Sequence, residues 1–193
     1  MAAPLPSMET RARVASEAAQ SFVEHYYEAL NRRHNLAPFY ASTSGRLTAA
    51  GVKPDISING NLCETVAEYE GLLNKQGSPV HCTYEIHSFD AHAINPHYTA
   101  GLHPSSSSSS SSADPAGSGM NRAERKAVEA GDRVSVAVQV SGTARYGKAG
   151  GEATTERAFT EAWLLVPHWE AWARNAPRGL RRWVAVSQNF RTL

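Results

Sequence analysis

The strictest pattern in this sequence lies near residue 134, where apolar residues and small residues alternate. Four valines alternate there with four small side chains: Val134, Val136, Val138 and Val140 against Ser135, Ala137, Gln139 and Ser141. A period of two places the valines on one face of a β-strand and the small residues on the other. The segment is therefore predicted to be a strand of an antiparallel sheet that is covered on one side.

Three further segments alternate in the same way and predict strands over about residues 80–93, 157–166 and 182–192. In the first, the apolar phase slips near Ser88, which predicts a β-bulge. In the strand over 157–166, Thr160, Ala162 and Leu164 face outward if Phe159 and Trp163 point inward. In the last strand, one set is predicted to face inward and the other outward: Val184, Val186, Gln188 and Phe190 against Trp183, Ala185, Ser187, Asn189 and Arg191.

The first third of the chain carries helical patterns. Apolar residues recur at spacings of three and four from about Thr10 to Arg33, which predicts a long helix with one buried face. A short helix is predicted around residues 36–41, a chain break at 42–45, and a third helix over about 64–75. Asn59–Gly60 predicts a two-residue hairpin turn, since both residues tolerate positive φ. Helices followed by long strands predict an α+β fold, with three N-terminal helices packed on an antiparallel sheet.

The segment from 94 to 132 has no periodicity and contains eight consecutive serines at 105–112. Such a segment buries too little apolar surface to offset its ordering entropy. The chain is therefore predicted to have a flexible N-terminus (1–12) and a single domain (13–193), with an inserted Ser-rich mobile loop at 95–131. Residues 121–128 are candidates for a short mixed-charge helix. A second loop, 167–180, contains Trp169 and Trp172, which are exposed there unless they pack back onto the fold.

Charge and cysteine content exclude several classes of function. The formal net charge is +1, which does not favour strong autonomous binding to nucleic acid. Two cysteines and no CxxC pair give no disulfide framework and no zinc site, so a reducing compartment and no cofactor or metal are expected. The first residues lack the basic start and apolar run of a secretory signal, and no segment is long and apolar enough to span a membrane.

Four short strings, in this order along the chain, resemble the nuclear transport factor 2-like superfamily. They are Ala18–Tyr27 in the first helix, Asn59–Asn61 in the hairpin, Phe159–Leu165, and Trp183–Arg191, which ends in Asn-Phe-Arg. The resemblance extends to the branch that forms the small subunit of the mRNA-export heterodimer, in the fungal form known as the mRNA transport regulator, which has a long insertion. It implies a cone with a strongly curved sheet; nothing is carried over to residues 94–132 individually.

The resemblance also implies a function. A chain of this branch is a non-catalytic subunit that stabilises the large subunit of the export receptor and helps to carry mRNA through nuclear pores, with pre-ribosomes as a possible second cargo. The implied partners are the large subunit, nucleoporins with phenylalanine-glycine repeats reached through the heterodimer, and RNA contacted weakly or indirectly, with no membrane. The implied location is the nucleus and nuclear pore, with shuttling to the cytoplasm.

Small, weakly charged side chains on adjacent strands suit close approach by another protein, because charged residues are depleted at the centre of interfaces. The alternative is a solvated sheet face. The predicted partner interface comprises Ser135, Ala137, Gln139, Ser141, Thr160, Ala162, Leu164, Trp183, Ala185, Ser187, Asn189 and Arg191. In the resembled branch the arginine that matches Arg191 forms a salt bridge with an aspartate of the large subunit.

Two alternative functions remain open. A homodimeric import carrier of the same fold would pair this sheet face with a second copy of itself. An isomerase or dehydratase would use the cone as a pocket with an acid/base group, for which the candidates are His25, Tyr26, Tyr27, His87 and Asp90. Possible RNA contacts lie in two basic segments: Arg122, Arg125 and Lys126, and Arg181 and Arg182.

Overall fold

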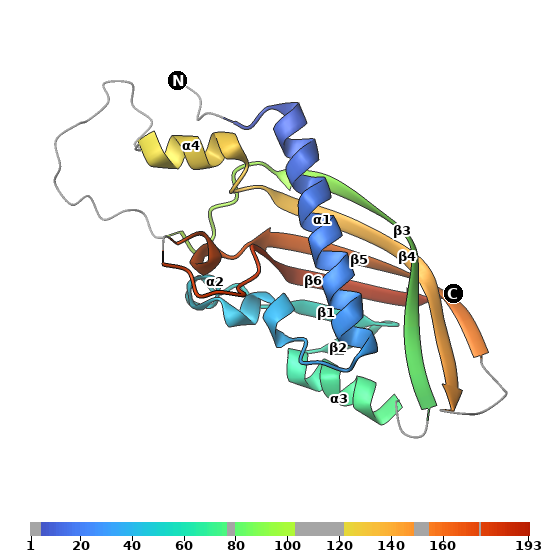
Figure 1. Ribbon diagram of the computed structural model, residues 1–193. Coiled ribbons are helices and arrows are strands. Elements are labelled where there is room, and N and C mark those ends of the chain that lie inside the picture. The colour runs from blue at the N-terminus through green and yellow to red at the C-terminus, as the bar shows by residue number, and fades with distance from the viewer. Residues whose placement is uncertain (1–4, 77–79, 103–121, 149–154, 174) are drawn as a thin grey trace.

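A computed structural model describes residues 5–76, 80–102, 122–148, 155–173 and 175–193. One long helix crosses a strongly curved six-stranded sheet, whose strand order is β2-β1-β6-β5-β4-β3 (Figure 1). The elements in chain order are α1 (Met8–Asn31), the 3₁₀ turns η1 (Ala37–Phe39) and η2 (Ala41–Thr43), α2 (Gly45–Ala49), β1 (Asp55–Ile58), β2 (Asn61–Cys63), α3 (Val66–Gln76), β3 (Val80–Asn95), α4 (Arg122–Ala130), β4 (Ser135–Lys148), β5 (Thr155–Pro167), η3 (Trp169–Trp172) and β6 (Trp183–Thr192). This confirms the predicted α+β fold.

Helix α1 begins earlier than the sequence indicated. The hydroxyl of Ser7 accepts a hydrogen bond from the Thr10 amide at 3.0 Å and caps the helix, so residues 8–12 are helical, not a flexible end. The predicted apolar stripe is buried against the sheet, including Phe22, Tyr26 and Tyr27. The second predicted helix is instead two 3₁₀ turns. Ser44, expected to break the chain, caps α2 by accepting from the Leu47 amide.

The sheet is antiparallel except at one pairing. Strands β3, β4, β5 and β6 pair antiparallel in sequence, with the predicted bulge in β3 between Ile86 and Ser88. The predicted hairpin is confirmed, with φ of 52° at Asn59 and 87° at Gly60. Its first strand, however, runs parallel to β6 over Asp55–Ile58, which the local pattern did not reveal.

The two sheet faces carry separate apolar clusters. The inner face packs against α1 and holds the main core, with the valines of β4 and Phe159, Trp163 and Phe190. The outer face is covered at one end by a smaller cluster of Ala41, Leu47, Val166, Trp169 and Val184. Because η3 folds over this end, both loop tryptophans pack back onto the domain; Trp169 is buried and Trp172 half-buried.

The segment predicted as an inserted loop is partly regular. Asn95 belongs to β3, and residues 122–130 form α4, with Val128 fully buried. The short helix predicted for 121–128 is therefore confirmed. The serine run lies outside the described residues.

Gly142 lies where β3 and β4 meet at the bulge, and its position leaves no space for a side chain. A Cβ there would approach the Glu85 carbonyl oxygen at 2.1 Å and the Phe159 ring at 2.9 Å. Gly142→Ala should lower the free energy of unfolding by about 3 kcal/mol, as overpacking does in tight sites. Urea denaturation measures this. Gly71→Ala is the control: nothing lies within 4 Å of its Cβ, and alanine should stabilise α3 by about 0.5 kcal/mol. Equal effects would contradict the prediction.

Candidate functional site

Beyond the outer apolar cluster, the outer face of the sheet is open and its side chains lie in register. One row crosses four strands: Ser57, Asn189, Ala162 and Gln139 are successive partners across β1, β6, β5 and β4. A second row joins Arg191, Thr160, Ser141 and Ser88, and a third joins Ser187, Leu164 and Ala137. We call these eleven residues the open face. Among them Arg191 is the one charged side chain, and the same rows continue at their borders to Asp90 and His92 on β3 and to Asp55 on β1.

Most of the predicted interface residues lie on this outer side of the sheet, but two do not. A register shift between Leu164 and Leu165 lets Val186 bulge out of the β5–β6 ladder, so that Ser187 and Ala185 are successive partners of β5. Ala185 is thereby turned into the core and is fully buried. Trp183 packs against the same core and donates from its indole to the Val134 carbonyl at 3.0 Å. Both are corrections, because a single bulge reverses the inside-outside parity of every residue before it.

Ser135 has the expected parity but is 3% exposed, and its hydroxyl accepts from the Asn95 amide. It therefore contributes to the β3–β4 pairing and has little surface for a partner. Sequence reasoning missed Ser57, because the β1–β6 pairing alone brings it beside Asn189. Whether the open face binds a partner stays a prediction.

Arg191 is held at one corner of the open face. Its Nε donates to the Asn189 side-chain oxygen at 3.2 Å, and its guanidinium lies against Gly60 of the hairpin turn. The Asn59 side chain accepts from the Thr192 amide at 2.8 Å and ties the turn to the end of β6. The side chain is exposed, so its remaining donors are accessible to a carboxylate of another molecule.

The inner face contains a feature that the sequence did not indicate, a buried polar cluster. Glu161 and Gln188, each 1% exposed, lie beside the tyrosines of α1. Tyr27 donates to one carboxylate oxygen of Glu161, and the Gln188 amide donates to the other at 2.7 Å. Tyr40 donates to the Gln188 carbonyl at 2.5 Å. Both carboxylate oxygens of Glu161 are thus satisfied inside the protein.

Tyr26 and Tyr69 complete this cluster. The Tyr26 hydroxyl lies 3.2 Å from that of Tyr69 and 3.4 Å from that of Tyr40. Burial raises the pKa of Glu161 from 4.5 to about 7, and the hydrogen bonds from Tyr27 and Gln188 limit the rise. Burial likewise raises the pKa of the Tyr26, Tyr27 and Tyr40 hydroxyls, so these groups remain neutral donors and acceptors.

The structure separates the residues proposed for an enzyme. His25, His87 and Asp90 are exposed on the surface, whereas Tyr26 and Tyr27 are buried in the cluster. Glu161 is the interior acid that a cone-type enzyme would need, but it is almost fully buried and bonded at both oxygens. No three His, Cys, Asp or Glu side chains among the described residues gather as a metal site requires.

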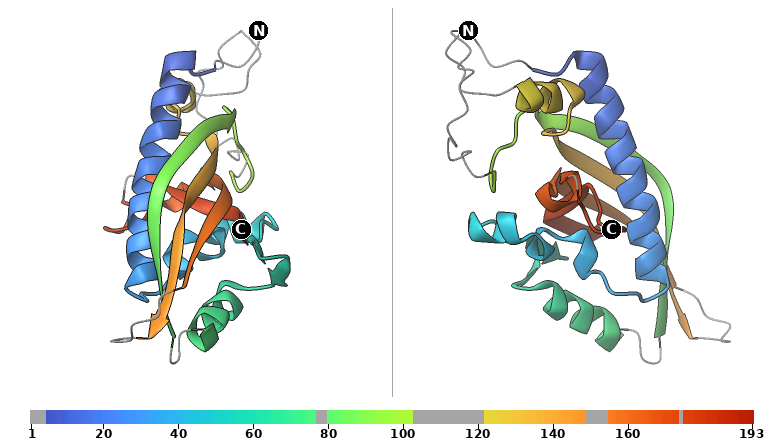
Figure 2. Two further views of the ribbon diagram at one scale, coloured as in Figure 1. Left: turned by 90° about the vertical axis from the view of Figure 1, so that its right-hand side faces the viewer. Right: turned by 60° about the vertical axis from the view of Figure 1, so that its left-hand side comes forward.

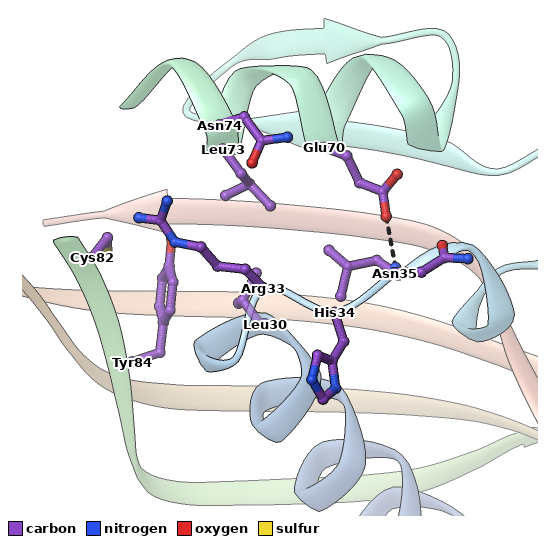
Figure 3. A pocket seen from close by; sticks show the side chains of 10 residues that line it. Leu30, Arg33, His34, Asn35, Glu70, Leu73, Asn74, Cys82 and Tyr84 are labelled. Atoms are coloured by element: carbon purple, nitrogen blue, oxygen red, sulfur yellow. Dashed lines mark hydrogen bonds between the residues drawn. The ribbon is translucent and has the colours of Figure 1, made fainter. Parts of the chain in front are cut away.

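A cavity of about 260 Å³ lies between the end of α1, α3 and β3 (Figure 3). Its apolar side is formed by Leu30, Leu36 and Leu73, and Arg33 reaches across it toward Cys82. The Glu70 carboxylate, on α3 like Leu73, accepts a hydrogen bond from the Leu36 amide at 2.7 Å. Because Glu161 does not line this cavity, the cavity does not connect the buried acid to a substrate.

The candidate RNA contacts lie on two separate elements. Arg122 and Lys126 are exposed on α4, and Arg125 is half-buried there. The guanidinium of Arg181 lies 3.7 Å from the centre of the Phe39 ring, and that of Arg182 lies 4.9 Å from the Trp172 ring. These cation–π contacts hold both arginines of the loop against the domain, which limits their reach toward phosphates. No helix in the described parts of the chain has the length and apolar composition to cross a bilayer.

No family model matches the sequence, and no curated protein matches it. Three solved structures share the fold over 93% of this chain. A chain from the Sac3N peptide bound to Mex67:Mtr2 has a TM-score of 0.74, 25% identity and 99% of its own length covered. A chain from the Chaetomium thermophilum Mex67 NTF2-like domain complexed with Mtr2 has a TM-score of 0.73, 25% identity and 98% coverage. Mtr2 solved by itself has a TM-score of 0.71, 23% identity and 99% coverage, which supports the fold.

Proposed function

From the premise that this chain has the nuclear transport factor 2-like fold, we propose that it is the non-catalytic small subunit of a heterodimeric mRNA-export receptor. The observation that carries the proposal is the open face, where small side chains lie in register across the middle of the sheet and the charged residues Arg191, Asp55 and Asp90 lie at its border. A solvated sheet face normally carries many charged residues, whereas the centre of a protein interface is depleted of them.

The partner is a large subunit of the Mex67 type, bound through its own nuclear transport factor 2-like domain. Similarity to chains from two complexes of Mex67 with Mtr2 supports this choice, and the match covers nearly the whole of each chain. In this role the chain stabilises the large subunit and helps to carry mRNA through nuclear pores, with nucleoporins reached through the heterodimer. It acts in the nucleus and at the pore and shuttles to the cytoplasm.

The first test is the mass of the complex. Co-expression with a Mex67-type large subunit should yield a one-to-one heterodimer by light scattering, and the chain alone should self-associate or be poorly soluble. A stable homodimer that does not exchange with the large subunit would favour the import-carrier alternative. A stable monomer in the presence of the large subunit would contradict the proposal.

The second test locates the interface on the open face. Ala162 is exposed at its centre, so Ala162→Cys should react rapidly with a maleimide in the free chain and be protected at least tenfold in the complex. Ala123→Cys, exposed on α4, is the matched control and should react equally in both states. Mass spectrometry of the labelled peptides separates these thiols from Cys63 and Cys82. Equal labelling of Ala162→Cys in both states would exclude the open face.

A further inference from the structure

Strand β3 forms one border of the sheet, and along its outer edge no strand pairs with it in the described structure. It runs from Val80 to Asn95 and is the green strand beside α1 in the left view of Figure 2. An edge strand presents backbone N–H and C=O groups that another chain can pair with. The register is interrupted between Ile86 and Ser88 and between Ala93 and Asn95, so the edge has two regular stretches, Val80–Ile86 and Ser88–Ala93.

The protein itself shows that this edge accepts a partner. The side-chain amide of Asn31, at the end of α1, donates to the Tyr84 carbonyl at 2.8 Å and accepts from the Tyr84 amide at 2.7 Å. This pair of bonds reproduces what a neighbouring strand would form with Tyr84. Asn31 therefore closes the edge at Tyr84, and farther along the strand the Ala91 amide donates to the Asp90 side chain at 2.8 Å, a bond that an added strand would replace.

A groove of about 610 Å³ lies between α1 and β3; its β3 lining runs from Tyr84 to Phe89, so it borders the beginning of the stretch Ser88–Ala93. Its floor is apolar, formed by the buried Val23 and Tyr27 and by Phe89, which is 40% exposed. Phe89 pairs with Val140 in the ladder and so lies on the α1 side of the sheet. An aromatic ring left this exposed beside buried apolar residues has surface that an incoming side chain can cover.

The charges that line the groove are all of one sign. Glu24 and Glu28 stand on the α1 rim, and the lining contains no lysine or arginine. Arg32 does pair with Glu28 at 3.0 Å, but both side chains are more than half exposed, and such pairs contribute little. An incoming segment with basic side chains would therefore gain favourable contacts along this rim.

We propose that a segment of another protein, with alternating apolar and basic residues, binds here as an added strand on Ser88–Ala93. Its backbone pairs with the free edge of β3, its apolar side chains cover Phe89, and its lysines or arginines face Glu24 and Glu28. The groove lies mainly on the α1 side and meets the open face at Ser88, which borders both surfaces. The inference rests on the groove alone and stands whether or not the chain is an export subunit.

The test uses the full chain and a synthetic probe, an acetylated (Lys-Val)₄ amide with a fluorescent label. Anisotropy should give a dissociation constant in the micromolar range. Glu24→Lys with Glu28→Lys should weaken binding at least tenfold, and Phe89→Ser at least fivefold. The control pair, Glu9→Lys with Glu17→Lys, makes the same charge change on the same helix at exposed positions outside the groove and should change binding less than twofold.

Two further measurements distinguish strand addition from simple charge attraction. A block peptide, (Lys)₄(Val)₄, has the same composition without alternation and should bind at least tenfold more weakly. Hydrogen exchange should slow at the amides of 88–93 when the alternating peptide binds. Equal binding of both peptides, equal effects of both glutamate pairs, or unchanged exchange in β3 would each overturn the proposal. Dimerisation of the chain through β3 that excludes the peptide would overturn it as well.

Discussion

Replacing Arg191 by glutamate is expected to weaken the heterodimer by roughly 30-fold to 4,000-fold. A charged residue that loses a buried, hydrogen-bonded partner across an interface costs about 2–5 kcal/mol, with each 1.4 kcal/mol equal to a factor of ten. Arg191 is suited to this role because Asn189 and the Asn59–Gly60 turn hold its guanidinium at the corner of the open face. Less side-chain freedom is then lost when a carboxylate of the large subunit binds.

The control for this variant is Arg157→Glu. Arg157 is exposed on β5 but opposes Ala144, which is fully buried on the inner side, so it lies on the opposite side of the sheet from the open face. Affinity measured by isothermal titration should fall for Arg191→Glu and stay within about twofold for Arg157→Glu. If a compensating charge reversal in the large subunit restores binding, the carboxylate is identified. Unchanged affinity of Arg191→Glu would remove this residue from the interface.

Glu161→Ala is expected to destabilise the fold more than any exposed substitution. It leaves the Tyr27 hydroxyl and one N–H of the Gln188 amide without an acceptor in the core, and each buried polar group left unpaired costs about 1–3 kcal/mol, so the loss is roughly 2–6 kcal/mol. Glu156→Ala on the same strand breaks an exposed pair with Arg145 and should cost less than about 1 kcal/mol. Chemical denaturation at pH 6 measures both. Similar losses would show that the buried cluster does not stabilise the fold.

The carboxyl of Glu161 also predicts that the stability of the fold depends on pH. Because its pKa is raised from 4.5 to about 7 in the folded state, the folded protein binds the proton more tightly than the unfolded chain does. The stabilisation that Glu161 contributes to the free energy of unfolding is complete below pH 4.5 and is lost as the pH rises through 7. At 1.36 kcal/mol per pKa unit, the loss is about 3 kcal/mol. Glu161→Gln should remove that part of the slope between pH 5 and 8, since an amide does not titrate. An unchanged slope would contradict the assignment to Glu161.

Hydrophobic periodicity predicted a helix or strand correctly where one face of the segment packs against the same core along its whole length. The α1 stripe and the β4 valines are buried as predicted, because each packs one unbroken face against the same core. The turn at Asn59–Gly60 was predictable from two residues, since positive φ selects for them. The bulge near Ser88 was visible because the apolar phase itself changes there.

The errors come from contacts between distant segments. Val184 and Val186 look like the inner face of β6, yet η3 and α2 form a second cluster on the outer side that buries Val184, and a bulge at Val186 turns Ala185 inward. Trp183 was predicted to face outward for the same reason, but it packs against the inner core. The alternation with Thr160 and Ala162 is consistent with an inward position for Glu161. No feature of the sequence, however, showed that Tyr27 and Gln188 donate hydrogen bonds to its carboxylate.

The sequence by itself determined the helices α1, α3 and α4, the four long strands, the turn at Asn59–Gly60, and which β4 and β5 residues point away from the core. These properties depend on neighbours along the chain, within one or two helical turns or a strand's alternation. Only the tertiary structure decided the parallel pairing of β1 with β6, the edge position of β3, and the polar cluster around Glu161. Each of these joins residues far apart in sequence, whose contact energies exist only once the chain has folded.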